Sequence, residues 1–600
     1  MRKYIFISLL FVFIGSYTVN DEKLIHEVQL FLDNYNKTYQ ELYYKSSLAE
    51  WKLNTYIVEG DTLTKKLAQI ASEELARFSG STVNIETARK YLKDKDKLEQ
   101  LQVKQLERIL YLAGNNPETA GDIVKEKIKA ETEQVEKLYG YDFKIDGRSV
   151  TTNEIDNRLE EENDLKERLK VWVASKEVGK NLKEGLIKLQ NLRNKSVQAL
   201  GYSDYFNYQV SDYGMTTEEM LALCKSMVKE IWPLYRELHT WARYTLAEKY
   251  GTEVPDMIPA HWLPNRWGQD WLAMVNVHGL DINSALKEKT SEWIVQQGED
   301  FYVSLGFKKL PETFWEKSSL YPLPADAGYK KNNHASAWHM DLEYDVRSLM
   351  SVEPDAGWWE TVLHELGHIY YYITYTNPDV PVILRKGANR GFHEAIGSLI
   401  GLASMQKPFL VHRGLADANA ETEEIQILLK EALNYIVFIP WSAGVMTEFE
   451  HELYANNLSP DQFNKKWWEL VEKYQGIVPP FQRGEEFCDA ATKTHINNDA
   501  AQYYDYAISY VLLMQFHKYI SDVILNQDPH STDYWGNKDI GTFLRDLMYP
   551  GSSVDWREHL NKTIGSPLSA KPMLEYFAPL LDHLKKINAG RTYTLPENFN

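Results

Sequence analysis

Apolar residues recur at helical spacing through most of the chain, and alternating strand patterns are scarce. From Glu22 to Glu248 apolar residues stand three or four positions apart among Lys, Asp, Gln and Glu, and the stretch Leu165–Leu200 is rich in long-chain helix formers. Residues 141–151 contain the turn-forming pair Asp146-Gly147 and are typical of a small hairpin. The pattern predicts a mainly α-helical protein.

Nothing in the sequence marks a boundary between domains. A chain of 600 residues would allow several domains of about 100 to 200 residues each. However, no Pro-, Gly- or Ser-rich tract, low-complexity run or repeat interrupts it. We therefore predict a single domain over residues 20–600.

The first residues differ from the rest. Arg2 and Lys3 precede an apolar run from Tyr4 to Ile14, a pattern typical of a secretory signal. That run is too short to span a bilayer, and no later stretch reaches the roughly 20 apolar residues that a spanning helix needs. We predict a signal peptide over residues 1–19 and an exported protein, periplasmic or secreted, with no membrane anchor. The alternative is a buried first helix, which the polar run Asn20-Asp21-Glu22-Lys23 disfavours.

The net charge limits the possible binding partners, and the cysteine content limits the possible disulfides. With 66 Lys and Arg against 85 Asp and Glu, the net charge of −19 argues against nucleic acid and anionic membrane surfaces as partners. The two cysteines, Cys224 and Cys488, lie far apart in the sequence, and whether they form a disulfide cannot be deduced from it.

The pentapeptide His364-Glu365-Leu366-Gly367-His368 carries the clearest chemical signal. Two imidazoles four residues apart on a helix face the same side and can bind one metal ion. Glu365 flanks that position and is placed to take a proton from a zinc-bound water. Because a catalytic zinc needs a third protein ligand, we assign that role to Glu394. The alternative is a helix that carries two surface histidines.

The residues around the pentapeptide favour the metal site. The flanking residues make the helix apolar nearly all round, as in a buried helix: Trp358, Trp359, Val362, Leu363, Leu366 and Ile369. Buried His and Glu side chains need partners, and a metal supplies them. The helix is predicted to end near Asn377-Pro378, and a second apolar helix begins around Phe392 with Glu394 in its first turn.

The sequence around Glu394 is more specific. Residues 387–397, GANRGFHEAIG, resemble the second zinc segment of the angiotensin-converting enzyme family of peptidyl-dipeptidases. Other segments resemble family segments in the same order: Ile258–Leu263, Trp267–Gln269, His334–Trp338, Lys473–Gly476 and Tyr576–Phe577. The resemblance covers about residues 25 to 590.

The resemblance implies a fold and an activity. The expected fold is a two-lobed helical zincin whose two halves enclose a deep central channel under an N-terminal helical lid. The expected activity is zinc-dependent hydrolysis of the penultimate peptide bond, which releases C-terminal dipeptides from oligopeptides that have a free C-terminal carboxylate.

The resemblance also implies roles for residues outside the metal site. Tyr506 and His495 would donate to the oxygen that becomes negative during hydrolysis, and His334 with Ala335 would hold the substrate backbone. A buried carboxylate requires cationic and neutral donors. The resemblance assigns these donors to three residues: Gln269, Lys493 and Tyr503. The match to the family requires one inserted residue between Ile496 and Tyr503. The alternative is that Lys493 and Tyr503 have no role in binding, since single Lys and Tyr residues of a helical protein usually lie on the surface or in the core.

Several residues depart from the family pattern. The arginines that hold chloride in animal enzymes are replaced by Asn207, Val471 and Asp505, so we expect activity that does not require chloride. Ser398 stands where the family has an Asp that orients a zinc histidine, which predicts somewhat weaker zinc binding. Asp270, beside Gln269, is expected to disfavour acidic C-terminal residues in substrates.

Two other interpretations stay open. One is a different helical zincin, an oligopeptidase or a carboxypeptidase that removes single residues. The other is a catalytically silent member that serves as a binding protein.

The resemblance also bears on the source of the protein. Asn333 occupies a position where the animal members of the family have a disulfide-bonded cysteine, so that disulfide is missing here and a bacterial source is favoured.

Overall fold

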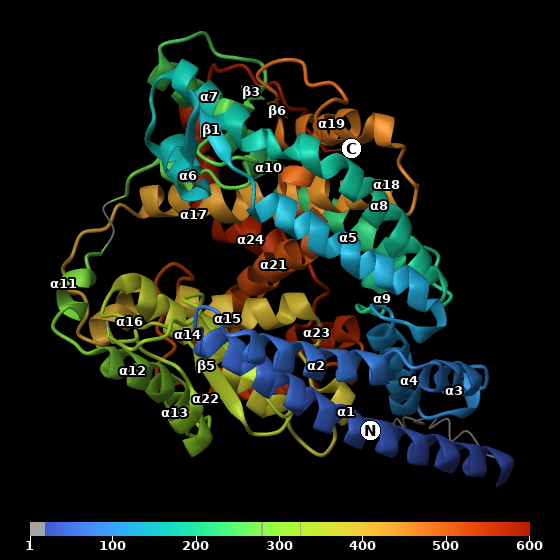
Figure 1. Ribbon diagram of the computed structural model, residues 1–600. Coiled ribbons are helices and arrows are strands. Elements are labelled where there is room, and N and C mark those ends of the chain that lie inside the picture. Colours follow the sequence, from blue (N-terminus) through green and yellow to red (C-terminus); the bar gives the residue numbers. More distant parts are fainter. Residues whose placement is uncertain (1–18, 278–279, 325, 600) are drawn as a thin grey trace, which may run out of the picture.

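The computed structural model describes residues 19–277, 280–324 and 326–599 (Figure 1). Residues 1–18 of the predicted signal peptide lie outside these ranges. The described chain is mainly helical, and its named strands form three two-stranded sheets. The prediction of a mainly α fold is confirmed, and no described helix is long and apolar enough to cross a membrane.

The N-terminal helices form a layer with a core of its own. They are α1 (Val19–Thr55), α2 (Thr62–Ser79), α3 (Thr82–Leu92) and α4 (Gln100–Ala113). Leu106 and Ile109, two of the apolar positions on α4, are fully buried beside Val28 and Leu32 of α1. Ile383 and Leu384 join the same cluster, so this layer covers the segment between the two helices that carry the candidate metal ligands.

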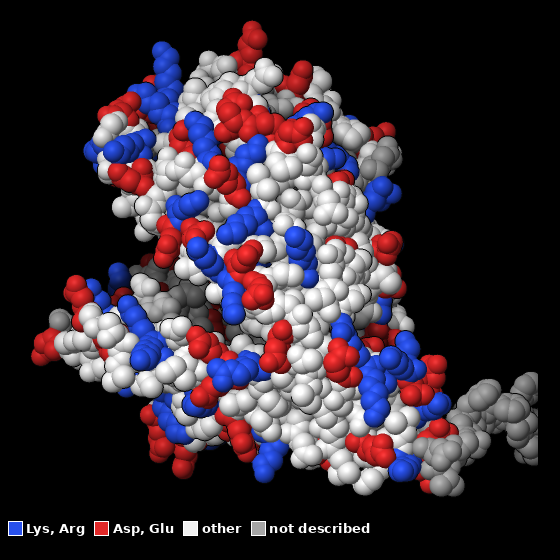
Figure 2. Space-filling view, turned by 45° about the vertical axis from the view of Figure 1, so that its right-hand side comes forward, with Lys and Arg blue, Asp and Glu red and all other residues white. Residues whose placement is uncertain are grey.

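The remaining helices form two halves, one above the other in Figure 1. The upper half holds α5 (Gly121–Tyr139), α6 (Thr152–Glu161), α7 (Leu165–Lys176), α8 (Val178–Gln198), α9 (Tyr205–Ser211), α10 (Thr217–Tyr250), α17 (Glu424–Ile439), α18 (Thr447–Tyr454) and α19 (Phe463–Gln475). The lower half holds α11 (Asn283–Leu286), α12 (Ser291–Ser304), α13 (Glu312–Lys317), α14 (Ala356–Tyr375), α15 (Arg390–Ser404), α16 (Lys407–His412), α22 (Lys538–Met548) and α23 (Trp556–Ile564). Figure 2 shows the surface hollowed between the halves.

The last helices connect the halves. Helix α21 (Tyr504–Tyr519) and α24 (Lys571–Tyr576) lie between them in Figure 1. Helix α20 (Thr494–Asn498) precedes α21 in sequence, and α25 (Ala578–Ile587) follows α24. Because α21 packs against α15 as well as α17, its side chains reach the region between the two halves.

The strands are short and local. β1 (Phe143–Ile145) pairs antiparallel with β2 (Arg148–Val150), and both turn residues, Asp146 and Gly147, have positive φ, so the predicted hairpin is confirmed. β3 (Ile258–Pro259) pairs parallel with β6 (Ile477–Val478). β4 (Ser336–His339) pairs antiparallel with β5 (Val346–Leu349), with Ser336 opposite Leu349.

Candidate active site

Helices α14 and α15 position the metal-binding candidates. The carboxylate of Asp355 accepts a hydrogen bond from the Trp358 N–H (2.8 Å) and begins α14. The predicted apolar face is buried, with Trp359, Val362 and Leu366 fully inaccessible. Helix α14 ends at Tyr375, just before the predicted stop. The Asn389 side chain caps α15 in the same way, by accepting from the Phe392 N–H (2.9 Å).

The structure brings the three predicted ligands together. The Nε2 atoms of His364 and His368 lie 3.1 Å apart, and Oε2 of Glu394 lies 3.8 and 4.0 Å from them. Two ligands at about 2.0 to 2.1 Å from one tetrahedral zinc stand roughly 3.4 Å apart. Burial lowers the pKa of both histidines to about 4, so each imidazole is neutral and has a lone pair for a metal. The donor set therefore fits zinc.

Glycines allow the two helices to approach closely. A Cβ on Gly367 of α14 would lie 2.9 Å from the Cα of Gly397 on α15, and one on Gly397 would lie 3.0 Å from the His364 ring. Any larger residue would force the helices apart. The approach of α15 to α14 thus places Glu394 against the two histidines.

A contact absent from the sequence analysis orients His368. Its Nδ1 lies 2.7 Å from Nδ1 of His393, whose ring stacks on Tyr371. For Nε2 of His368 to bind a metal, its Nδ1 must carry the proton, so His368 donates this hydrogen bond. No hydrogen bond is found from Ser398 to either histidine in the described ranges. The only sequence signal for His393 was its place next to Glu394.

Glu365 lies in a dry position beside the ligands. Only 7% of the residue is exposed, and its Oε2 has no hydrogen-bond partner among the described residues. Burial, and then the charge of Glu394, raise the pKa of Glu365 to about 8, and a cation bound by the neighbouring ligands would oppose this rise and favour the carboxylate that can accept a proton. A buried polar atom without a partner favours a bound water or ion at this point.

A cavity of about 900 Å³ opens beside the metal ligands. His364, His368, Glu394 and Glu365 lie in its wall, and His334 with Ala335 lies there too, immediately before β4. His334 is exposed. The structure therefore places these predicted residues around one space.

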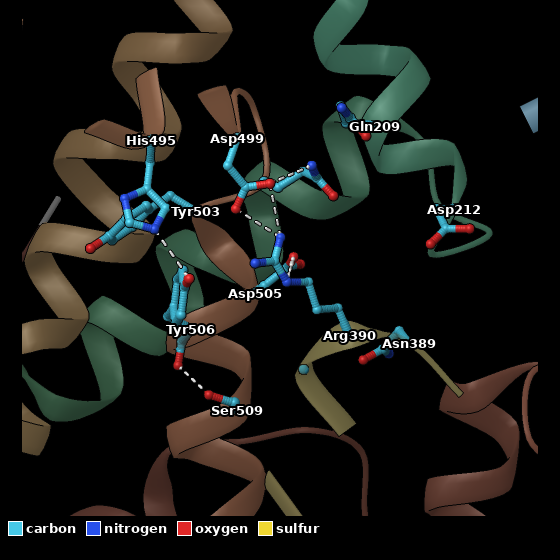
Figure 3. Close-up of polar contacts among 12 residues, drawn as sticks. Gln209, Asp212, Asn389, Arg390, His495, Asp499, Tyr503, Asp505, Tyr506 and Ser509 are labelled. Atoms are coloured by element: carbon cyan, nitrogen blue, oxygen red, sulfur yellow. Dashed lines mark hydrogen bonds and ion pairs between the residues drawn. The ribbon is translucent and has the colours of Figure 1, made fainter. Parts of the chain in front are cut away.

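The predicted donors for the oxyanion form a second, adjoining group. Nε2 of His495, on α20, lies 3.2 Å from the Tyr506 hydroxyl, on α21 (Figure 3). Tyr506 lies near the metal-binding helix, since its ring centroid is 5.7 Å from the guanidinium carbon of Arg390 at the start of α15. The two groups thus meet at the junction of α15 and α21.

The predicted carboxylate-binding residues also come together. Lys493 Nζ donates to Gln269 Oε1 at 2.6 Å and lies 5.2 Å from the Tyr503 ring centroid. The Tyr503 ring contacts His495, with centroids 4.9 Å apart. Burial lowers the pKa of Lys493 to about 7, and no carboxylate of the described residues lies within ion-pair distance of its Nζ. The loop before Tyr503, where the resemblance placed an inserted residue, contains Ala501 at φ 60°, an uncommon conformation for a residue other than glycine.

Sequence comparisons identify the family. Residues 22–595 match the sequence profile of the angiotensin-converting enzyme family. The chain is 32% identical over 448 residues to an angiotensin-converting enzyme of Theromyzon tessulatum, covering 71% of each chain. It is 30% identical over 601 residues to that of Mus musculus, covering 95% of this chain and 44% of the relative.

The chain belongs to the angiotensin-converting enzyme family. It is therefore a member of a family of zinc-dependent metallopeptidases, and its His-His-Glu group is compatible with zinc. It spans under half the length of the mammalian angiotensin-converting enzymes it matches, for example 31% of the one from Bos taurus.

Two features bear on the departures that we expect from the family pattern. Cys224 and Cys488 are both buried and free. Asp505 is buried at the start of α21, where it accepts a hydrogen bond from the Tyr213 hydroxyl and lies 3.7 Å from Nε of Arg390. Burial raises the pKa of Asp505 to about 7, and the nearby Arg390 opposes that rise.

Proposed function

We propose that this chain is a zinc-dependent peptidyl-dipeptidase that releases dipeptides from the C-termini of oligopeptides. The observation that carries the proposal is the pairing of Lys493 with Gln269 beside Tyr503. The Tyr503 ring in turn contacts His495, which lies within hydrogen-bond distance of Tyr506. Lys493 is a buried cation with no carboxylate partner among the described residues, which suits the binding of a free C-terminus.

The residues divide the work of hydrolysis. Zinc, when bound by His364, His368 and Glu394, supplies Lewis-acid chemistry: it lowers the pKa of water and polarises a peptide carbonyl. Glu365 takes the proton of the attacking water and passes it to the leaving amine. Tyr506 and His495 donate to the oxygen that becomes negative.

Substrate binding uses the chain's remaining predicted residues. Lys493, Gln269 and Tyr503 bind the terminal carboxylate. His334 and Ala335 lie immediately before β4, and residues 334–337 line the cavity, where an extended peptide can lie along them. Asp270, beside Gln269, carries a pKa raised by burial and disfavours acidic C-terminal residues.

The test compares an N-blocked tripeptide with its C-terminally amidated twin. Each is incubated with the zinc-loaded protein and again after chelation, and the products are identified by mass. We expect zinc-dependent release of a dipeptide from the free acid alone. Release of a single residue would indicate a carboxypeptidase, and equal cleavage of the amide would remove the carboxylate requirement. No cleavage with zinc demonstrably bound would favour a binding protein.

We also propose that activity does not require chloride. The negative charge beside Arg390 and Tyr213 is supplied by Asp505 itself, so an anion gains little by binding there. The rate of tripeptide cleavage should stay constant when chloride replaces acetate at fixed ionic strength. A several-fold rise would contradict this.

Export is a separate proposal, which rests on the apolar run Tyr4–Ile14 after Arg2 and Lys3. N-terminal sequencing of the protein recovered from the periplasm or medium should begin near residue 20. Recovery of the intact N-terminus from the cytoplasm would contradict export.

A further inference from the structure

Arg390 is a cation at an unfavourable place. It is the first residue of α15, one turn before the metal ligand Glu394. The N-terminus of a helix has a partial positive charge, so a cation there is destabilising unless other groups compensate for it. Its side chain is 40% exposed and lies in the wall of the cavity.

Two carboxylates compensate for that charge, and each lies on a segment that carries a proposed oxyanion donor. Nη1 of Arg390 donates to Asp499 at 2.9 and 3.1 Å, and Nε lies 3.7 Å from Asp505 (Figure 3). Asp499 caps α20, where its N–H donates to the carbonyl of His495 at 2.9 Å. Asp505 is in the first turn of α21, next to Tyr506.

The guanidinium also contacts Tyr506 directly. Its carbon lies 5.7 Å from the Tyr506 ring centroid, within the range of a cation–π contact. The hydroxyl at the far end of that ring meets Nε2 of His495. One side chain therefore holds the ring of Tyr506, the end of α20 and the start of α21 against the helix that carries Glu394.

We propose that Arg390 is a positioning residue that fixes the Tyr506 hydroxyl relative to the metal ligands. The inference rests on the proposed function, because the hydroxyl matters only if it stabilises charge that develops during hydrolysis. An exposed ion pair alone contributes little. Here Asp505 is buried, with only 3% of its side chain exposed, and the pair belongs to a network that joins three segments.

The position of Tyr506 affects the transition state more than the bound substrate. Loss of Arg390 should therefore lower kcat and leave KM nearly unchanged. Because Arg390 acts through Tyr506, its removal should have no further effect once the hydroxyl is gone.

The experiment measures kcat and KM for tripeptide cleavage by the zinc-loaded wild type and by R390M, Y506F and R390M/Y506F. We expect R390M to lower kcat roughly tenfold, with KM within about twofold, and R390M/Y506F to match Y506F. R390K, which keeps the charge but loses the planar fork, should recover part of the loss.

Two further variants separate positioning from a general effect on stability. R591M removes an arginine whose guanidinium carbon lies 4.6 Å from the Tyr244 ring centroid. Arg591 does not line the cavity, so R591M should leave kcat unchanged. D499N removes one anchor of Arg390 without touching the Tyr506 ring and should lower kcat less than R390M does. If R390M fails to bind zinc, kcat of D499N tests the inference in its place.

The outcomes are distinguishable. Wild-type cleavage with an unchanged kcat in R390M, a rise confined to KM, or an equal further loss in the Y506F background would overturn this inference alone. If R390M does not fold, an unchanged kcat in D499N would overturn it. A zinc-loaded wild type that releases no dipeptide would overturn the proposed function and this inference with it.

Discussion

Nδ1 of His368 lies 2.7 Å from Nδ1 of His393, and this contact orients the imidazole that we predict to bind the metal. Ser398, which stands where the resemblance led us to expect a carboxylate in this part, makes no hydrogen bond to either histidine in the described ranges. A neutral histidine therefore provides the partner, and burial keeps its pKa well below the usual value. The predicted metal ligand His368 thus has an uncharged neighbour.

Replacing His393 should weaken zinc binding. H393L removes the acceptor for the His368 N–H, so we expect zinc affinity to fall roughly 10- to 100-fold. Competition with a chromogenic chelator measures this. S398A is the matched control on the same helix and should change affinity less than about twofold. A larger loss in S398A than in H393L would show that Ser398 is the true partner.

Replacing Glu365 should remove catalysis and keep the metal. E365Q preserves the shape of the side chain but cannot accept a proton at neutral pH, so kcat should fall about 10²- to 10⁴-fold. Zinc content, measured by atomic absorption, should stay at the wild-type level because Glu365 is not one of the three grouped ligands. Activity within a few-fold of wild type would assign the base elsewhere.

Replacing Lys493 should abolish selectivity for a free C-terminus. K493M removes a charged hydrogen bond to the carboxylate, so kcat/KM for the free acid should fall about 10- to 100-fold, while the amide is little affected. K176M is the matched control, since Lys176 is also buried and lies against the same Trp267 ring but does not contact Gln269. A loss confined to K176M would show that Lys176, and not Lys493, binds the terminal carboxylate.

Binding of the terminal carboxylate by Lys493 should also depend on pH. Lys493 has its pKa lowered to about 7, so it is protonated below pH 7 and loses its charge as the pH rises through that value. We expect the ratio of kcat/KM for the free acid to kcat/KM for the amide to fall above about pH 7. Taking this ratio removes the effect of titrating groups that act on both substrates. In K493R this additional fall should disappear because arginine stays charged. An identical profile for the two substrates would contradict the prediction.

The local elements could be predicted from the sequence because their signals are local. Helical periodicity, the stop near Asn377-Pro378 and the Asp146-Gly147 turn depend on neighbouring residues, and the structure confirms each. The histidines of the predicted metal site could also be identified from the sequence, because a spacing of four residues on a helix places His364 and His368 on one face. Glu394 needed only the additional expectation of a second helix.

Contacts between distant segments needed the tertiary structure. The His368–His393 hydrogen bond depends on how α15 rotates against α14, and the close approach through Gly367 and Gly397 decides that rotation. The resemblance named Gln269 and Lys493, which lie 224 positions apart, but their 2.6 Å contact and the low pKa of the lysine follow from burial. Arg390 had no signal at all: its two carboxylates come from other segments, and charge pairing between segments is set by packing that no local pattern encodes.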